Sequence, residues 1–268
     1  MTIKQRILTA LVLLPLLILL LGFASPMVFS VFLTLVLFVS LLEYNKMGLA
    51  GEHGLEQWLS AAAGAAVVPV LALNQPELLV PLYTGLYLVL ALLFLFRLPP
   101  IEETHHRLGW LVSGTVYLPL LIGHLVPLHQ LAYGKQWIFL LLIAVMACDS
   151  MAYFIGRKFG KRKLYPAVSP NKSIEGAYGG ILGAVLGVLF AKLFFLQAIG
   201  WFGVLGIGVA LGVFGQLGDL FESLLKRACR VKDSGTMIPG HGGLLDRLDS
   251  LLFVFPLVYY IAKYGYGG

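Results

Sequence analysis

The residue types best suited to chemistry gather in one segment, 223–249, of an otherwise strongly apolar chain. Its charged residues are Lys226, Arg227, Arg230, Lys232, Asp233, Asp246, Arg247 and Asp249. Between them lies the sequence Pro-Gly-His-Gly-Gly (239–243), which is too rich in glycine for a stable helix. Glycine lets backbone N–H groups approach a phosphate closely, Lys and Arg supply countercharge, and carboxylates suit magnesium. The segment therefore predicts a site for a phosphate compound carrying magnesium.

A stripe of small and acidic residues precedes this segment. Gly208, Gly212, Gly215, Asp219 and Glu222 follow one another at steps of four, three, four and three, so a helix places them on one face. Asp219 is either a polar group at a helix end or a metal ligand. We expect a ligand, because magnesium uses one or two carboxylates together with phosphate oxygens. Glu222 shares the face and is a second candidate ligand.

The segment 223–249 also resembles the hallmark sequence of phosphatidate cytidylyltransferases (CDP-diacylglycerol synthases). It reads S-x-L-K-R-x4-K-D-x-G-x2-I-P-G-H-G-G-L-x-D-R-L-D, which covers about a tenth of the chain. The resemblance implies magnesium-dependent transfer of a cytidylyl group from CTP to phosphatidate, giving CDP-diacylglycerol and pyrophosphate for phospholipid synthesis. It implies Asp246 as a metal ligand beside Asp219, and a second metal ion is compatible with it.

Other residues of the segment are assigned roles around the phosphates. We expect the catalytic charges to come from Lys226, Arg227 and Lys232, which would hold phosphate groups. Substrate contacts are expected from Gly242, Gly243 and Arg247. Asp249 belongs either to the site or to an ion pair with Arg247. His241 could be a general base or a metal ligand, but no His or Cys lies nearby at zinc spacing, so we favour a hydrogen bond to phosphate.

A second region, beginning at Asp149, resembles another recurring region of the same family. Asp149 is either a satisfied polar group in the core or a site residue, and we expect the site, with a role as metal ligand. The sequence Ser-Pro-Asn-Lys-Ser-Ile-Glu-Gly (169–176) leads into the next apolar run. We expect Ser169, Lys172 and Ser173 to bind nucleotide phosphate there, because the first N–H groups of a helix lack partners. The basic run 161–163 is expected to be a solvated surface.

Composition predicts the fold that positions these residues. Hydrophobic residues make up 59% of the 268 residues, charged residues only 12%, and the mean hydropathy is +0.89. We predict an all-α, polytopic integral membrane protein, a single transmembrane domain (1–268) of about nine helices. The expected spans are 7–23, 27–42, 58–73, 78–98, 108–127, 137–155, 177–199, 201–225 and 251–264, with a polar turn at 101–107. The first could be a signal peptide, but a second span follows at once, so we expect it to be retained.

The predicted spans divide the chain into N-terminal spans (1–130) and a catalytic region (137–264) with cytoplasmic loops at 156–176 and 226–250. With nine spans and the N-terminus inside, all of the 19 Lys and Arg residues except Lys135, Lys192 and Lys263 fall on the inner side. We therefore expect a site facing the cytoplasm, in a bacterial inner membrane. The net charge of +6 is explained by orientation and by anionic phosphate, so no nucleic-acid partner is expected. The two cysteines give no disulfide framework.

Two other functions are alternatives to this interpretation. A transporter of an anionic substrate would carry charges near mid-membrane and inverted repeats, whereas the charges here cluster at one surface. A CDP-alcohol phosphotransferase would carry the sequence D-x2-D-G-x2-A-R, which is absent. The expected partners are CTP, phosphatidate and membrane lipid. Glycines at 179, 183 and 187, four residues apart, predict close helix contacts and would also allow a homodimer.

Overall fold

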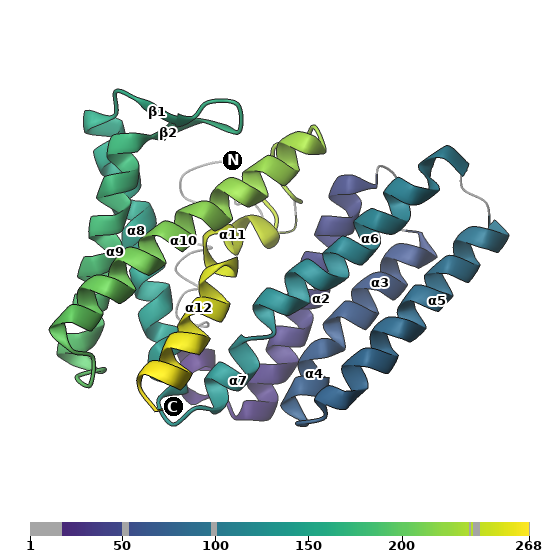
Figure 1. Ribbon diagram of the computed structural model, residues 1–268, viewed down its shortest axis with the longest axis horizontal. Coiled ribbons are helices and arrows are strands. Elements are labelled where there is room, and N and C mark those ends of the chain that lie inside the picture. Colours follow the sequence, from purple (N-terminus) through teal and green to yellow (C-terminus); the bar gives the residue numbers. More distant parts are fainter. Residues whose placement is uncertain (1–17, 50–53, 98–100, 236, 238–241, 268) are drawn as a thin grey trace. The chain divides into compact units, whose positions relative to one another are not determined.

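The computed structural model describes residues 18–49, 54–97, 101–235, 237 and 242–267. It divides into two compact units, whose helices and strands are labelled in Figure 1. The first unit comprises 1–127 with 233–247, and the second comprises 128–232 with 248–268. The first predicted span lies outside the described residues except at its end, where residues 18–23 are helical.

Seven described helical segments are long and apolar enough to cross a membrane. They are Pro26–Gly48, Leu55–Ala72, Pro76–Phe96, Ile101–Gln130, Gly134–Phe159, Ile174–Phe194 and Trp201–Ala228. These correspond to predicted spans two to eight, so the all-α, polytopic membrane fold is confirmed. The predicted ninth span is not one continuous helix. It is divided into α11 (Asp249–Leu252), α12 (Val254–Tyr260) and the π-helical turn η3 (Ile261–Gly265), and the count of nine stays a prediction.

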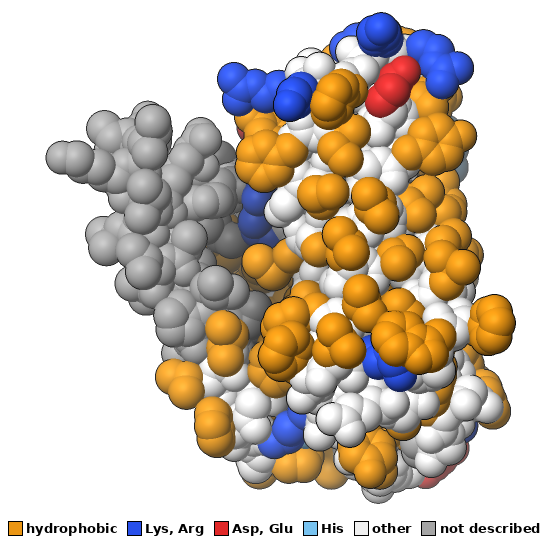
Figure 2. Space-filling view, turned by 90° about the vertical axis from the view of Figure 1, so that its left-hand side faces the viewer, with side chains coloured by type: hydrophobic (Ala, Val, Ile, Leu, Met, Phe, Trp, Pro, Cys, Tyr) orange, Lys and Arg blue, Asp and Glu red, His pale blue; other side chains and the backbone are white. Residues whose placement is uncertain are grey.

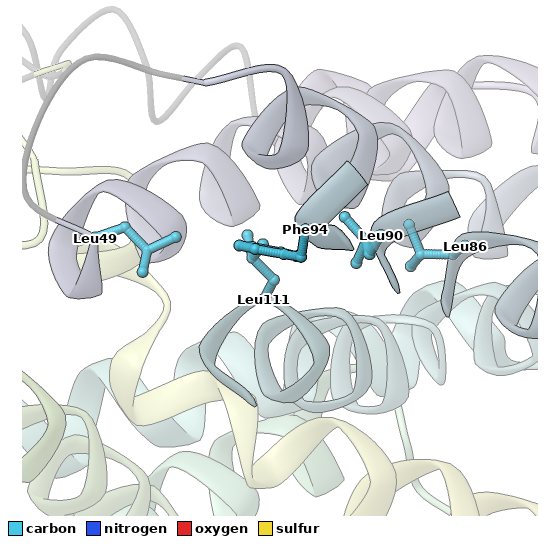
Figure 3. Close-up of a cluster of buried hydrophobic side chains, with 5 residues drawn as sticks. All are labelled: Leu49, Leu86, Leu90, Phe94 and Leu111. Atoms are coloured by element: carbon cyan, nitrogen blue, oxygen red, sulfur yellow. The ribbon is translucent and has the colours of Figure 1, made fainter. Parts of the chain in front are cut away.

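The first unit is a group of helices around an apolar core. Its elements are α2 (Pro26–Gly48), α3 (Leu55–Ala65), α4 (Val67–Ala72), η1 (Pro76–Leu78), α5 (Leu79–Arg97), α6 (Ile101–Ile122) and η2 (Leu245–Arg247), and α7 (Leu125–Gln130) contains the division between the units. Leu86, Leu90 and Phe94 follow one another at steps of four along α5, so they share a face. Figure 3 shows that face against Leu49, just after α2, and Leu111 of α6.

The polar sequence 101–107, predicted as a turn, is helical and forms the start of α6. Glu102 and Glu103 lie in the first turn, where negative side chains interact favourably with the helix dipole. Arg107 then reaches α3, and its Nη2 lies 2.8 Å from Oε1 of Glu56. The prediction was wrong because polar residues at a helix start look like a turn when only hydropathy is considered.

The second unit contains three long helices and a small hairpin. Its elements are α8 (Gly134–Phe159), β1 (Lys163–Tyr165), β2 (Ser169–Ser173), α9 (Ile174–Phe194) and α10 (Trp201–Ala228), followed by α11, α12 and η3. The antiparallel strands pair Lys163 with Ser173 and Tyr165 with Ser169, at the end of α8 and α9 that carries the site (Figure 1). The sequence predicted a polar loop at 156–176, and the hairpin within it was not predicted.

Glycines let the three long helices approach closely. A Cβ at Gly183 would meet the backbone of Ala147 on α8, and a Cβ at Gly212 would lie 2.8 Å from the Cα of Ile181 on α9. The predicted close helix contacts are therefore confirmed, and they lie within the unit. The glycine stripes are used inside one chain and give no support to a homodimer.

The outer surface of the second unit is apolar. Along α9, Tyr178, Leu182, Leu186 and Phe190 are exposed at steps of four. Figure 2 shows hydrophobic side chains over this face and a group of Lys and Arg side chains at the upper end, where Figure 1 places the hairpin. An apolar band with basic residues at one end is typical of a membrane-embedded helix group whose basic end lies at the lipid headgroups.

Candidate functional site

The second unit contains a pocket of about 460 Å³ next to the hairpin, lined by apolar and charged residues. Its lining comes from α8, both strands, the start of α9 and part of α10: Asp149, Ala152, Tyr153, Gly156, Arg157, Leu164, Asn171, Lys172, Ser173, Gly176, Ala177, Gln216 and Asp219. The pocket therefore brings together Asp149, Lys172, Ser173 and Asp219, which the sequence had singled out in three separate segments.

Lys172 and Asp219 form an ion pair in the wall of this pocket. The Lys172 Nζ lies 2.5 Å from Oδ2 of Asp219, and the two side chains are 26% and 27% exposed. The hydroxyl of Ser223 donates to Oδ1 of the same aspartate at 3.4 Å. The sequence assigned Lys172 to phosphate and Asp219 to metal, and the structure places these two residues side by side. The wall offers a cation for a phosphate group and an anion for a metal ion.

A second group of carboxylates is joined by Ser250. Its hydroxyl lies 3.0 Å from Oδ2 of Asp149 and 3.1 Å from Oδ1 of Asp249, and its backbone N–H donates to Asp249 at 2.7 Å. One hydroxyl proton cannot be donated to both carboxylates at once. Burial, together with the nearby Asp219 carboxylate, raises the pKa of Asp249 to about 6. The carboxyl groups of Asp149 and Asp249 thus lie close together beside the pocket, where they could share a bound cation.

Glu222 and Lys226, both predicted to act in the site, form an ion pair with each other in the interior of the unit. The Lys226 Nζ lies 3.1 Å from Oε1 of Glu222, whose side chain is fully buried. Neither residue is among those that line the pocket. The burial of this pair and its absence from the pocket lining are typical of a structural ion pair, and contact with metal or phosphate stays a prediction.

The remaining predicted cations lie near the end of α10. Arg227 donates from Nε to the carbonyl of Val168, at 3.3 Å, and from Nη1 to the carbonyl of Val231, at 3.2 Å. It therefore ties the turn between the strands to the end of the helix. Lys232 is exposed.

The hairpin is fixed to the start of α9 by two side chains. Ser173 is the N-cap of α9, and its hydroxyl accepts the Gly176 N–H at 3.1 Å. Glu175 accepts the N–H groups of Lys161, at 3.0 Å, and Arg162, at 3.2 Å. Ser173 lines the pocket, but its oxygen already serves as the helix cap. Ser169 begins β2 and is partly buried.

In the first unit, Asp246 organises the described part of the glycine-rich segment. Its Oδ2 accepts the Gly243 N–H at 2.8 Å, the Ser234 N–H at 2.9 Å and the Ser234 hydroxyl at 3.0 Å. Gly242 has a φ of +83°, a conformation that favours glycine. Arg247 is exposed, and His241 lies outside the described residues. Asp246 thus closes a loop on itself through three donors.

The sequence missed Glu43, near the end of α2, which bonds the same segment. Its carboxylate accepts the N–H of Leu244 at 3.0 Å and that of Leu245 at 2.8 Å. The signal that could have identified it is its place as an ionisable residue directly after the expected apolar span 27–42. Tyr153, Arg157, Asn171 and Gln216 were also missed as lining residues of the pocket, although three of them lie in segments that the sequence had singled out.

The predicted pair of metal ligands, Asp219 and Asp246, is divided between the two units, so a metal held by both stays a prediction. Among the described residues, the structure contains no group of three or more His, Cys, Asp or Glu side chains arranged to hold a metal ion. Magnesium does not require such a group, since it is commonly held by one or two carboxylates with substrate phosphates and water. The pocket offers magnesium the carboxylates of Asp149 and Asp219.

These features define a helical membrane protein with a charged pocket at one end of its long helices. The sequence matches the model of the cytidylyltransferase family over residues 4–264, and the chain belongs to this family. The resemblance carried by residues 223–249 is thereby confirmed.

Proteins named phosphatidate cytidylyltransferase are among the relatives. The chain is 42% identical to that of Bacillus subtilis over 181 residues, which is 66% of each sequence. It is 44% identical to that of Staphylococcus epidermidis over 137 residues, 51% of this chain and 53% of the relative. Identity to the Staphylococcus aureus protein is 44% over 138 residues, with the same coverage. The matches span about two thirds of the first relative and about half of the others.

Proposed function

We propose that the protein transfers a cytidylyl group from CTP to phosphatidate, forming CDP-diacylglycerol and pyrophosphate. The observation that carries the proposal is the Lys172–Asp219 pair in the pocket of the second unit, beside the carboxylate of Asp149. Membership of the cytidylyltransferase family and the names of the relatives supply the nucleotide and the lipid. The basic end of the apolar helices supports a site where a soluble nucleotide meets a lipid headgroup.

The reaction requires charge neutralisation and alignment more than covalent help from the protein. A phosphate oxygen of phosphatidate attacks the α-phosphorus of CTP, and the bond to pyrophosphate breaks as the new phosphoanhydride bond forms. The second pKa of a phosphate monoester is about 6, so the attacking oxygen is already largely ionised and needs no general base. Lys172 and Arg157, which both line the pocket, are the cations that we assign to the phosphates. Lys226 is not assigned to them because it is buried against Glu222.

We further propose that magnesium is the cofactor, held by Asp219 with Asp149 or Asp249. Carboxylate oxygens are the ligands that a hard divalent cation prefers, and Ser250 brings the carboxylates of Asp149 and Asp249 together beside the pocket. When bound, magnesium would neutralise charge on the phosphates of CTP. The assignment of Asp246 to the same metal rests on the sequence motif alone.

The proposed membrane is the bacterial inner membrane, with the pocket facing the cytoplasm. The relatives named above are bacterial proteins. The excess of Lys and Arg on the hairpin side supports the orientation, because cytoplasmic segments of membrane proteins are enriched in these residues. CTP is a cytoplasmic nucleotide, so this orientation also gives it access to the pocket.

The function can be tested with the purified protein reconstituted in phosphatidate-containing vesicles. We expect CDP-diacylglycerol and pyrophosphate to form in equal amounts when CTP and magnesium are added, and neither when phosphatidate is left out. Uptake of an anion into the vesicles without a CDP-lipid would favour a transporter. Consumption of added CDP-diacylglycerol in the presence of an alcohol, with release of CMP, would favour a CDP-alcohol phosphotransferase. Either result would contradict the proposal.

A further inference from the structure

We propose that Glu43 is a positioning residue for residues 242–246, the described end of the glycine-rich segment and the turn that follows it. Its carboxylate holds Leu244 and Leu245 against α2 and so fixes the orientation of Asp246. The inference deepens the proposed function and rests on it, because Asp246 matters for catalysis only if the segment serves cytidylyl transfer. All the residues concerned lie in the first unit.

The two oxygens of the Glu43 carboxylate accept hydrogen bonds from two backbone N–H groups. Oε1 accepts the Leu244 N–H at 3.0 Å, and Oε2 accepts the Leu245 N–H at 2.8 Å. Each oxygen therefore serves a different backbone donor. A carboxylate is suited to this arrangement because both of its oxygens accept hydrogen bonds, whereas an amide offers one acceptor and one donor group. The two N–H groups belong to the residues immediately before Asp246.

The Ser234 hydroxyl lies between the carboxylates of Glu43 and Asp246. The Ser234 hydroxyl lies 3.0 Å from Oδ2 of Asp246 and 3.4 Å from Oε2 of Glu43. Its single proton can serve only one of them, and the shorter distance favours Asp246. Because Ser234 N–H also donates to Asp246, the serine fixes the aspartate from one side while Glu43 fixes the preceding backbone from the other.

Gly235 and Gly243 pack closely against the side chain of Glu43. A Cβ at Gly235 would lie 2.6 Å from Oε1 of Glu43, and a Cβ at Gly243 would lie 2.5 Å from its Oε2. Atoms do not approach so closely without a hydrogen bond, so a side chain at either position would displace the carboxylate or the loop. Gly235 therefore leaves room for a residue that lies about 200 positions earlier in the chain, and Gly243 leaves room both for it and for the Ser234 hydroxyl.

Glu43 is buried, and burying a carboxylate costs solvation free energy. The residue is only 8% exposed and lies near the end of a membrane-spanning helix. Burying a carboxylate is unfavourable unless hydrogen bonds compensate for the lost water, and here the compensating donors are supplied by the glycine-rich segment. The same bonds that make the burial tolerable also hold the segment to α2.

The proposal is tested with Glu43→Gln, compared with Glu56→Gln as a matched control. Glu56 is a partly buried carboxylate of the same unit that pairs with Arg107 of α6 instead of with the glycine-rich segment. In Glu43→Gln the new amide nitrogen would face a backbone N–H, so one of the two bonds must break. Hydrogen exchange is followed at Leu244 and Leu245, and kcat and KM for CTP are measured in the same preparations.

We expect Glu43→Gln to speed exchange at Leu244 or Leu245 by about 10-fold or more, the loss of roughly one hydrogen bond, while α2 keeps its protection. The kcat should fall by about 100-fold, as expected when a reacting group is misplaced by about 1 Å, and KM should change much less. Glu56→Gln should leave all of these values near those of the unchanged protein. Unchanged exchange at both amides, or an equal loss of kcat in Glu56→Gln, would overturn the proposal.

Two features keep the test decisive. The exchange measurement does not depend on activity, so it reports on the Glu43 contacts even if the unchanged protein fails to form a CDP-lipid, which would contradict only the proposed function. If Glu43→Gln does not fold, Glu43→Asp keeps the charge on a shorter side chain and is expected to speed exchange at Leu244 or Leu245 and lower kcat with little change in KM. Unchanged exchange and kcat in that variant would also overturn the proposal.

Discussion

Lys172 and Asp219 meet in the pocket wall as a partly exposed ion pair. Such pairs contribute about 0–1 kcal/mol to stability, because solvent screens the charges and two flexible side chains must be ordered. The pair is therefore not needed to hold α10 against the hairpin. Its value lies in placing opposite charges where a phosphate and a cation are proposed to bind together.

We predict that Asp219→Asn is produced and folded normally but loses at least about 100-fold in CDP-diacylglycerol formation, the size of loss seen when one charged transition-state contact is removed. Asn keeps the shape of Asp and removes the charge on which a magnesium ion depends. Residual activity should need more magnesium than the unchanged protein. Glu103→Gln, which removes an exposed charge at the start of α6, is the control. Near-normal activity of Asp219→Asn at ordinary magnesium would remove Asp219 from the site.

Glu222 is expected to behave differently although it lies on the same helix. Glu222→Gln removes the charge of one partner of a buried ion pair, and such a loss costs about 3–5 kcal/mol. We therefore predict a marked fall in the thermal unfolding temperature, whereas Asp219→Asn should shift it little. Thermal denaturation of the detergent-solubilised variants compares the two. A stable but inactive Glu222→Gln would instead support the original prediction of a metal ligand.

The sequence could predict which residues are chemically notable but not which of them meet. Asp219 and Glu222 share a helical stripe, so periodicity alone gave them one role, yet one lines the pocket and the other is buried against Lys226. The difference arises from tertiary packing, which a stripe does not contain. Glu43 was missed for a similar reason, since its partners are 201 and 202 residues away.

At the scale of elements, long apolar runs predicted seven described helices because a membrane span leaves a strong hydropathy signal. Short or interrupted elements were not predicted. The strands β1 and β2 have three and five residues and no alternating apolar pattern. The ninth span was expected to be continuous, but the ring of Pro256 would clash with the carbonyl of Leu252 in a continuous helix, and α11 ends at that residue.

The contact between α9 and α10 gives a prediction with its control on the same helix. A side chain at Gly212 would run into the backbone of Ile181, whereas a Cβ at Gly206 has no neighbour within 4 Å. Gly212→Leu should therefore separate the helices and destabilise the protein by about 1–3 kcal/mol or more. Gly206→Leu adds the same side chain to an open position and should be tolerated. Equal thermal stability of the two variants would contradict the described packing.

In the proposed orientation, the hairpin end of the second unit faces the cytoplasm. The 21 residues of α9 span about 31 Å at 1.5 Å each, close to the hydrocarbon thickness of about 30 Å. The two ends of α9 should therefore lie on opposite sides of the membrane. Lys163 precedes this helix and Gln197 follows it, and both are exposed.

We predict that Lys163→Cys and Gln197→Cys are labelled from opposite sides. The variants are made in a background with Cys148→Ser and Cys229→Ser, since these are the two cysteines of the chain. A thiol reagent that does not cross membranes should label Gln197→Cys in intact cells and Lys163→Cys only after the cytoplasmic side is opened. The reverse pattern would contradict the orientation, and labelling of both from one side would contradict a spanning α9.

Direct transfer of the cytidylyl group to phosphatidate can be followed through the fate of labelled phosphorus. The reconstituted protein is given CTP labelled at either the α- or the γ-phosphorus, with phosphatidate and magnesium. We predict that α-label enters the lipid fraction as CDP-diacylglycerol, that γ-label leaves only as pyrophosphate, and that no label stays on the protein when phosphatidate is withheld. Transfer of γ-label to lipid, or a covalent cytidylyl-protein, would contradict the proposed reaction.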